Sequence, residues 1–158
     1  MSPFEKSLAF ILIVLLRVFG AEGGREGDSL ALVALMDANP ENLISWNTDT
    51  CMEAWKGVWL VDGRVDSLYL YQMRIDRLPA ETGNLTQLRA IHLMSNRLAT
   101  LPPEIGDLLN LKHLNLAQNK IIHVPSVIGT FPNLVYLNLR LNKSVDLPPQ
   151  IGGKLLAG

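Results

Sequence analysis

The sequence predicts an α/β solenoid, a right-handed superhelix with a parallel β-sheet on its concave face and a helical cap at its N-terminal end. Two observations lead to this fold class. The same apolar sequence pattern begins every 23 residues, at Val65, Leu88, Leu111 and Leu134. Within each copy of the pattern apolar and polar residues alternate, as in a strand that buries one face. One such unit cannot bury its apolar side chains alone, so neighbouring units must stack.

The first 23 residues have the pattern of a secretory signal peptide. Lys6 precedes an unbroken apolar run, 8–16, and small residues around Gly20 offer a cleavage site. An uncleaved anchor and a cytosolic product remain as alternatives, but Arg17 ends the run short of the roughly 20 apolar residues that a membrane span needs. We therefore expect a secreted product, or a cell-surface one if the native chain continues into a transmembrane segment. No later segment of this chain is long and apolar enough to span a bilayer.

Residues 24–63 are expected to form the cap. The Gly- and charge-rich stretch 24–30 is expected to be irregular, and Asp28 is expected to be the N-cap of a helix from Ser29 to Asp37. Asn39-Pro40 should end this helix, because the residue before proline is disfavoured in the α region. The single cysteine, Cys51, cannot form an internal disulfide, so it predicts a free thiol or an intermolecular bond.

A pattern of apolar, tryptophan and turn residues runs through the cap: Asp28, Leu32 to Leu35, Pro40, Leu43, Ser45, Trp46, Asn47, Cys51, Trp55, Gly57 and Val58. In these residues the cap resembles the plant-type N-terminal cap of extracellular leucine-rich-repeat proteins. The resemblance implies a second cysteine at position 60, where this chain has Leu60, so the family's cap disulfide cannot form. Burial of Trp46, Trp55 and Trp59 is expected to compensate in part.

Residues 64–158 are expected to form about four repeats that resemble leucine-rich repeats of the 23-residue typical class. Each strand should point two apolar residues inward, and a column of asparagines should satisfy buried backbone groups of adjacent turns. This column comprises Asn96, Asn119 and Asn142, with Met73 in its place in the first repeat. Leu-Pro and glycine positions recur in the second half of each repeat, where they predict extended segments, short helical turns and tight bends. Ser144 and Gly152-Gly153 make the last repeat incomplete, with no C-terminal cap, as expected of either a truncated product or a natural short protein.

The outward residues of the strands are expected to form the binding surface on the concave face. Aromatic, Met and Arg side chains are enriched at protein interfaces. The candidate residues are Tyr69, Tyr71, His92, Met94, His113, Asn115, Tyr136, Asn138 and Arg140. Their expected partner is a protein, peptide or glycan, and the alternative is a solvated sheet face without a specific ligand. Asn84-Leu85-Thr86 is a candidate N-glycosylation site, whereas Asn142, which also begins an acceptor tripeptide, should be buried and unmodified.

Composition and motifs argue against other classes of function. The formal net charge is −1 and no run of Lys or Arg occurs, so no nucleic-acid partner is expected. Neither a nucleophile elbow nor a phosphate-binding glycine loop is present, so we expect no enzyme and no cofactor. His92 and His113 have no Cys or carboxylate at ligand spacing, so no metal site is expected.

The predicted function is extracellular recognition of a protein or peptide. By resemblance to plant-type receptor kinases and receptor-like proteins, the chain is expected to be the N-terminal part of a receptor-like ectodomain in signalling or defence. The alternatives are a small secreted binder, similar to leucine-rich-repeat inhibitors of cell-wall-degrading enzymes, and a structural matrix component. A dimer through the open C-terminal end or through Cys51 is a further expectation.

Overall fold

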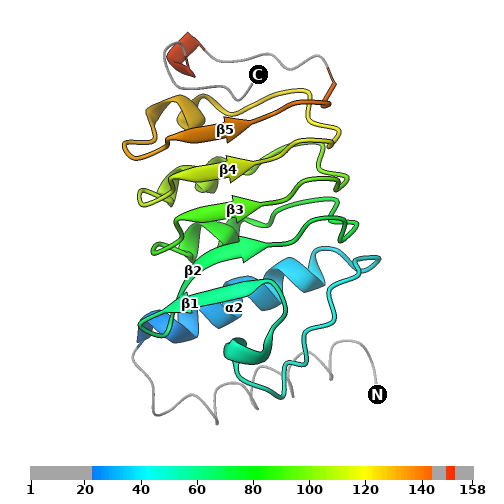
Figure 1. Ribbon diagram of the computed structural model, residues 1–158, viewed down its shortest axis with the longest axis vertical. Helices are drawn as coiled ribbons and strands as arrows, with labels where there is room; N and C mark the ends of the chain where they lie inside the picture. Colours follow the sequence, from blue (N-terminus) through cyan, green and yellow to red (C-terminus); the bar gives the residue numbers. More distant parts are fainter. Residues whose placement is uncertain (1–22, 144–148, 152–158) are drawn as a thin grey trace.

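A computed structural model describes residues 23–143 and 149–151, which form a stack of short strands with a helix at the N-terminal end (Figure 1). The helix is α2 (Gly23–Asp37). The strands are β1 (Val58–Val61), β2 (Arg64–Tyr69), β3 (Ala90–His92), β4 (His113–Asn115) and β5 (Tyr136–Asn138), in that order in one sheet. Strands β2 to β5 are parallel, and 3-10 turns on the opposite side return the chain from each strand to the next. These turns are η2 (Ala80–Asn84), η3 (Pro103–Asp107), η4 (Ser126–Thr130) and η5 (Pro149–Ile151), and η1 (Met52–Ala54) lies in the cap. The predicted α/β solenoid is confirmed.

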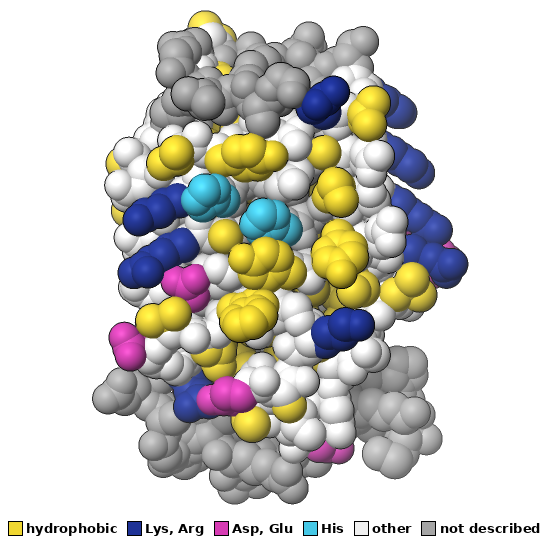
Figure 2. Space-filling model, in the orientation of Figure 1, with side chains coloured by type: hydrophobic (Ala, Val, Ile, Leu, Met, Phe, Trp, Pro, Cys, Tyr) yellow, Lys and Arg dark blue, Asp and Glu magenta, His cyan; other side chains and the backbone are white. Residues whose placement is uncertain are grey.

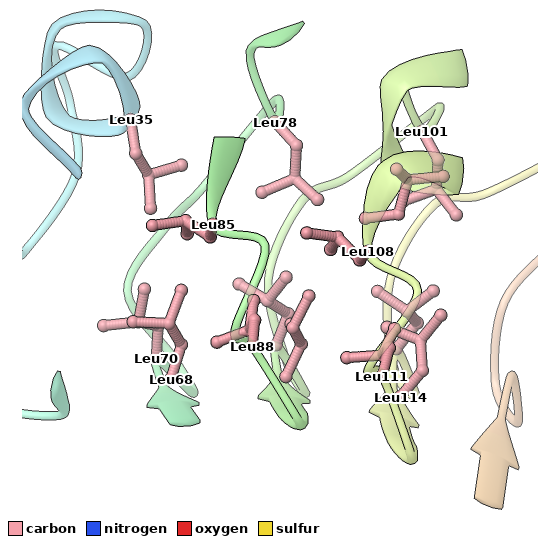
Figure 3. Packing of buried hydrophobic residues seen from close by; sticks show 14 of the residues in the cluster. Leu35, Leu68, Leu70, Leu78, Leu85, Leu88, Leu101, Leu108, Leu111 and Leu114 are labelled. Atoms are coloured by element: carbon pink, nitrogen blue, oxygen red, sulfur yellow. The ribbon is translucent and has the colours of Figure 1, made fainter. Parts of the chain in front are cut away.

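The inward side chains of successive repeats form one continuous core. Leu68, Ile91, Leu114 and Leu137 are paired in register across the four parallel strands, and all four are buried. A second layer from the return segments, including Leu85 and Leu108, lies above the strand leucines (Figure 3). Leu35 of α2 points into the same layer, so the helix covers the first end of the core. Since each leucine contacts its counterparts in adjacent repeats, the core is stabilised by stacking and not within any single repeat.

A turn and an asparagine follow each strand. Gln72, Ser95, Gln118 and Leu141 recur at 23-residue spacing with positive φ angles of 56° to 59°, so the chain bends there in the left-handed region. Just beyond the turn, the amide of Asn119 donates to the carbonyls of Leu93 and Leu116 and accepts from the backbone N–H of Leu98. Asn96 and Asn142 make the corresponding bonds one turn earlier and one turn later. The column therefore bridges adjacent turns and satisfies backbone groups that the strands leave unpaired.

The first repeat has no asparagine in this column, because Met73 takes its place. A residue of the cap makes a different connection there. The fully buried Asn39 donates from Nδ2 to the carbonyls of Leu35 and Arg77, and its Oδ1 accepts from the N–H groups of Asp76 and Arg77. Asn39 thus joins the C-terminal end of α2 to the return segment of the first repeat.

The start of the cap differs from the expectation. The helix begins at Gly23 and not at Ser29, so the stretch 24–30 is helical and Asp28 lies inside the helix. The Asp28 carboxylate is fully buried and accepts from Nε and Nη2 of Arg64, at 2.9 Å each, and from the N–H of Val65. The pKa of Arg64 is raised above its usual value, chiefly by this hydrogen bond to Asp28. Asp28 therefore holds the cap helix against β2 and does not cap the helix.

An antiparallel strand that the sequence did not predict closes the edge of the sheet. β1 pairs with β2, so the first parallel strand has no free edge. Gly57 permits this pairing: its φ is +85°, and a Cβ there would lie 2.4 Å from the carbonyl oxygen of Tyr69. Trp46 and Trp55 are buried as expected and stack with ring centroids 5.2 Å apart. Trp59 is not buried, because it lies on the outward face of β1 with 64% of its surface exposed.

The repeated glycines of the return segments have a different role from the one predicted. Gly83 and Gly106 have no positive φ, so they do not serve as special bends. A Cβ at Gly83 would lie 2.6 Å from the carbonyl oxygen of Glu104, and one at Gly106 would lie 2.1 Å from the side chain of Val127. Glycine therefore lets η2 and η3 each approach the next repeat closely.

Replacing Thr82 by valine is expected to raise the free energy of unfolding. Thr82 occupies the place in η2 that Ile105, Ile128 and Ile151 occupy in later repeats. It is buried, and its hydroxyl has no hydrogen-bond partner among the described residues. Valine has nearly the same shape and removes this unsatisfied group, which should increase stability by about 1–2 kcal/mol in urea denaturation.

Thr130→Val is the control for this prediction. Thr130 lies on the exposed side of η4, and its hydroxyl donates to the carbonyl of Val127. The substitution should therefore give no gain, or a small loss. A loss of stability in Thr82→Val would contradict the assignment of an unsatisfied hydroxyl.

Candidate binding surface on the concave face

The outward residues of the strands lie in columns that cross the sheet. The register pairs Tyr69 with His92, His92 with Asn115, and Asn115 with Asn138. A second column contains Ser67, Ala90, His113 and Tyr136. Neighbouring parallel strands lie about 4.8 Å apart, so side chains of one column are in contact range. Six of the nine candidate residues belong to these two columns: Tyr69, His92, His113, Asn115, Tyr136 and Asn138.

The other three candidates, Tyr71, Met94 and Arg140, lie just beyond the strand ends. Backbone pairing continues there, since Gln72 N–H donates to the Met94 carbonyl and Gln118 N–H donates to that of Arg140. Tyr71, Met94, Ala117 and Arg140 therefore form a third column beside the first. Tyr71 and Met94 are exposed, and Ala117 is buried.

Aromatic rings form a strip along the lower part of this surface. The Tyr69 and His92 rings are stacked with centroids 4.7 Å apart and planes 10° from parallel. Trp59 of β1 lies edge-on to Tyr69 at 6.4 Å. Farther up, His113 and Tyr136 lie 6.1 Å apart with tilted rings. Figure 2 shows these apolar and imidazole side chains side by side over the middle of the sheet. We call Trp59, Tyr69, Tyr71, His92 and Met94 the aromatic strip.

The two asparagines of the first column are partly engaged within the fold. Oδ1 of Asn115 accepts from the N–H of Ala117, and Oδ1 of Asn138 accepts from the N–H of Arg140. Nδ2 of Asn138 also donates to the Tyr136 hydroxyl. These bonds fix the amides at the ends of β4 and β5, so the upper part of the surface is polar and locally ordered.

His92 is expected to make stability depend on pH. Partial burial lowers the pKa of His92 below its ordinary value of 6.5, and the neighbouring His113 lowers it further. Between pH 6.5 and the lower folded-state pKa, the unfolded chain binds more protons than the folded chain, so acidification through this window should destabilise the fold. Chemical denaturation of the wild type and of His92→Asn from about pH 5 to 8, a range that brackets the ordinary pKa of histidine, measures the effect.

Below about pH 6.5, the stability of His92→Asn should fall less than that of the wild type. Asparagine is the residue that the same column carries in β4 and β5, so it fits the site. An identical pH dependence in the two proteins would contradict the assignment.

Three predicted features lie away from the concave face. Asn84 is exposed at the end of η2, where an oligosaccharide would extend into solvent. Asn142 is half-buried, and its Nδ2 donates to two backbone carbonyls. Cys51 is exposed in the cap. Residues 1–22 of the predicted signal peptide, Ser144 and the paired glycines at 152 and 153 lie outside the described residues.

The sequence interpretation missed two parts of this surface. Trp59 was assigned to the core of the cap, and only its pairing opposite Ser67 in the unpredicted β1 places it on the outward face. A row of cations at 23-residue spacing was also missed. It comprises Arg74, Arg97, Lys120 and Lys143, and the repeat period could have revealed it.

Within residues 23–143 and 149–151, no helix is both long and apolar enough to cross a bilayer. Over the same residues, no group of three or more His, Cys, Asp or Glu side chains is placed to hold a metal ion.

Residues 86–143 match the sequence family described as leucine rich repeat. The structure is that of a leucine-rich-repeat solenoid. No curated protein sequence matches the chain. The chain is similar to a solved leucine-rich-repeat protein of Leptospira interrogans, with 41% identity over 54% of this chain and a TM-score of 0.52. It spans only 22% of that protein.

Plant ectodomains are also similar in structure. The BIR2 ectodomain of Arabidopsis thaliana has a TM-score of 0.71 and 25% identity, with 83% of this chain and 82% of that chain covered. A chain of the BIR3–SERK2 complex of Arabidopsis thaliana has a TM-score of 0.55 and 21% identity, with 83% and 95% covered. This second likeness concerns the fold alone.

Proposed function

We propose that this protein is an extracellular recognition module that binds a protein or peptide along its concave face. The observation that carries the proposal is the aromatic strip, in which large apolar side chains remain exposed on an ordered sheet. Exposed apolar groups that gather in one patch mark interaction sites on soluble proteins. The parallel strands hold this patch rigid, which lowers the entropy lost when a ligand binds.

A receptor-like role is the finer part of the proposal. The apolar N-terminal run with its cleavage pattern supports secretion, and the cap resembles that of extracellular plant proteins. The likeness to the BIR2 ectodomain covers most of both chains. The exposed Asn84 is proposed as a glycosylation site of the secreted product. The leucine-rich-repeat fold provides a surface for recognition, so we propose a binding role and not an enzymatic one.

Replacement of either strip tyrosine is expected to weaken ligand binding strongly without unfolding the protein. Peptides selected from a random display library against the wild-type protein supply the ligand. Tyr69 and Tyr71 are exposed and contribute little to the core. Tyr69→Ala and Tyr71→Ala should each weaken the selected peptides by about 30-fold, as for aromatic hot spots, in isothermal titration calorimetry.

Leu109→Ala is the matched control, because Leu109 is a similarly exposed apolar residue that follows η3. It should bind the selected peptides with unchanged affinity. Urea denaturation of all three variants checks that folding is intact. If affinity is retained in Tyr69→Ala, in Tyr71→Ala and in a His92→Ala variant, the ligand does not occupy the concave face and the proposal is wrong.

A further inference from the structure

Positive charge is concentrated in the repeats, although the whole chain has a formal net charge of −1. Residues 86–143 contain six Lys and Arg but only two acidic residues, Glu104 and Asp107. Both acidic residues lie in η3, a return turn on the side of the solenoid opposite the sheet. Within residues 86–143 the charges are therefore separated, with the cations around the sheet face and the carboxylates behind it. In the first repeat, by contrast, Asp66 of β2 lies beside Arg89.

These cations form two rows that border the concave face. One row, at the start of the strands, consists of Arg89 and Lys112, and the N–H of Lys112 donates to the Arg89 carbonyl. The other row follows the strand ends, where Arg97 N–H donates to the Ile75 carbonyl and Lys120 N–H to that of Leu98. This second row consists of Arg74, Arg97, Lys120 and Lys143. Figure 2 shows Lys and Arg along both margins, with apolar and His side chains between them.

Most of this charge is available to a ligand. Arg89 lies 3.5 Å from Asp66, and Arg97 lies 3.6 Å from Glu41. Arg89, Arg97 and Glu41 are exposed and Asp66 is partly buried, and ion pairs that solvent reaches in this way contribute little. Across residues 23–143 and 149–151, no ion pair involves the four other row members, Arg74, Lys112, Lys120 and Lys143. Like charges held on successive turns about 4.8 Å apart repel one another, so an anion between or along the rows would relieve this repulsion.

We infer that the ligand of the concave face is an acidic peptide segment in extended conformation, lying on the aromatic strip with its carboxylates toward the two cationic rows. This inference rests on the proposed function and specifies the chemistry of its ligand. From β2 to β5 the sheet spans about 14 Å, which corresponds to four or five residues of extended chain. Apolar side chains of such a segment would contact the strip, while the rows would select against basic sequences by repulsion.

The inference is tested with fluorescein-labelled peptides in which Glu residues flank a central Leu-Tyr pair, and with the same peptides carrying Gln or Lys in place of Glu. Fluorescence anisotropy should show binding in the order Glu, then Gln, then Lys. Raising the salt from about 0.01 M to 0.15 M shortens the Debye length from about 30 Å to 8 Å, so the preference for Glu should shrink. Equal affinities for the Glu and Gln peptides, or an affinity that does not change with salt, would overturn the inference.

The double variant Lys112→Gln/Lys120→Gln removes one cation from each row. It should weaken the Glu peptide about three- to tenfold and leave the Gln peptide unchanged. The control Ser126→Glu/Thr130→Glu changes the net charge by the same two units on the exposed side of η4 and should retain the wild-type affinity. Equal losses in both double variants would indicate only an effect of overall charge and would refute a role for the rows.

The display selection separates this inference from the proposed function. Selected peptides that depend on Tyr69 but are not enriched in Glu and Asp would refute the acidic ligand and leave concave-face recognition intact. Peptides that bind independently of Tyr69, Tyr71 and His92 would refute both. Polygalacturonate oligomers are a further probe: if they bind through Lys112 and Lys120 while the Glu peptide does not, the ligand is an acidic polysaccharide and the peptide assignment is wrong.

Discussion

Asp28→Ala is expected to lower the free energy of unfolding by about 3–5 kcal/mol, the range observed when one partner of a buried ion pair is removed. The substitution leaves the Arg64 guanidinium without its two carboxylate contacts, and it leaves the buried N–H of Val65 without an acceptor. These bonds are the charged connection between α2 and β2. We therefore expect the cap to separate from the first repeat before the rest of the solenoid unfolds.

Urea denaturation followed by two signals tests this sequence of events. Trp46 and Trp55 lie in the cap, so their fluorescence reports mainly on the cap, although Trp59 of β1 adds to the signal. Far-UV circular dichroism reports on the whole chain. In Asp28→Ala the fluorescence transition should shift to lower urea concentration than the dichroism transition, because a repeat array loses cooperativity when an interface is weakened.

Two further variants provide controls for the Asp28 prediction. Arg25→Ala removes an ion pair with Glu53 that is exposed on the cap, so it should cost less than about 1 kcal/mol. In Arg64→Met the guanidinium is already absent, so adding Asp28→Ala should cost less than in the wild type. If the two single effects simply add, Asp28 acts through something other than Arg64.

Asn119→Ala is expected to have the second largest effect, about 3 kcal/mol or more. Asn119 is buried in the asparagine column and satisfies the carbonyls of Leu93 and Leu116 and the N–H of Leu98. Its removal leaves the N–H of Leu98 without an acceptor, and it takes one of two side-chain donors from each carbonyl, since Asn96 still donates to Leu93 and Asn142 to Leu116. Each unsatisfied group costs about 1–3 kcal/mol, and the small cavity adds to the loss. The free energy of unfolding from urea denaturation measures the effect.

An isosteric variant separates hydrogen bonding from packing. Asn119→Asp keeps the shape and the acceptor, but an ionised carboxylate cannot donate to the two carbonyls. It should therefore be about as destabilised at neutral pH as the alanine variant. Asn110→Ala is the matched control, because Asn110 is exposed and makes a single bond to the Thr86 carbonyl. A loss of similar size in Asn110→Ala would show that the column has no special contribution.

The repeat region was predictable because its evidence is local and repeated. Leu68, Ile91, Leu114 and Leu137 stand at one period, and the same period fixes which residues face outward. The columns that contain Tyr69, His92 and His113 follow directly from this register. Asn96 and Asn119 could be placed for the same reason, since a polar residue at a fixed position among leucines must satisfy the backbone around it.

The cap was less predictable because it occurs once. Asp28 precedes a run of helix-forming residues, which is the usual position of an N-cap, but its carboxylate is bound by Arg64, 36 residues later. Nothing in the local sequence distinguishes these two roles. Trp59 likewise alternates with buried residues of a strand whose existence depends on pairing with β2, so its exposure could not be derived from its own neighbours.

The sequence alone thus determined the solenoid, its inward and outward residues and the place of the candidate surface, because a 23-residue period repeats the same physical constraint in each turn. The tertiary structure decided the contacts that do not follow from this repeated pattern. It showed that Asp28 joins the cap to the sheet and that Gly83 and Gly106 allow close approach of adjacent repeats. It also brought Trp59 beside Tyr69, because the contacts of a residue that occurs once depend on the partners that folding brings to it.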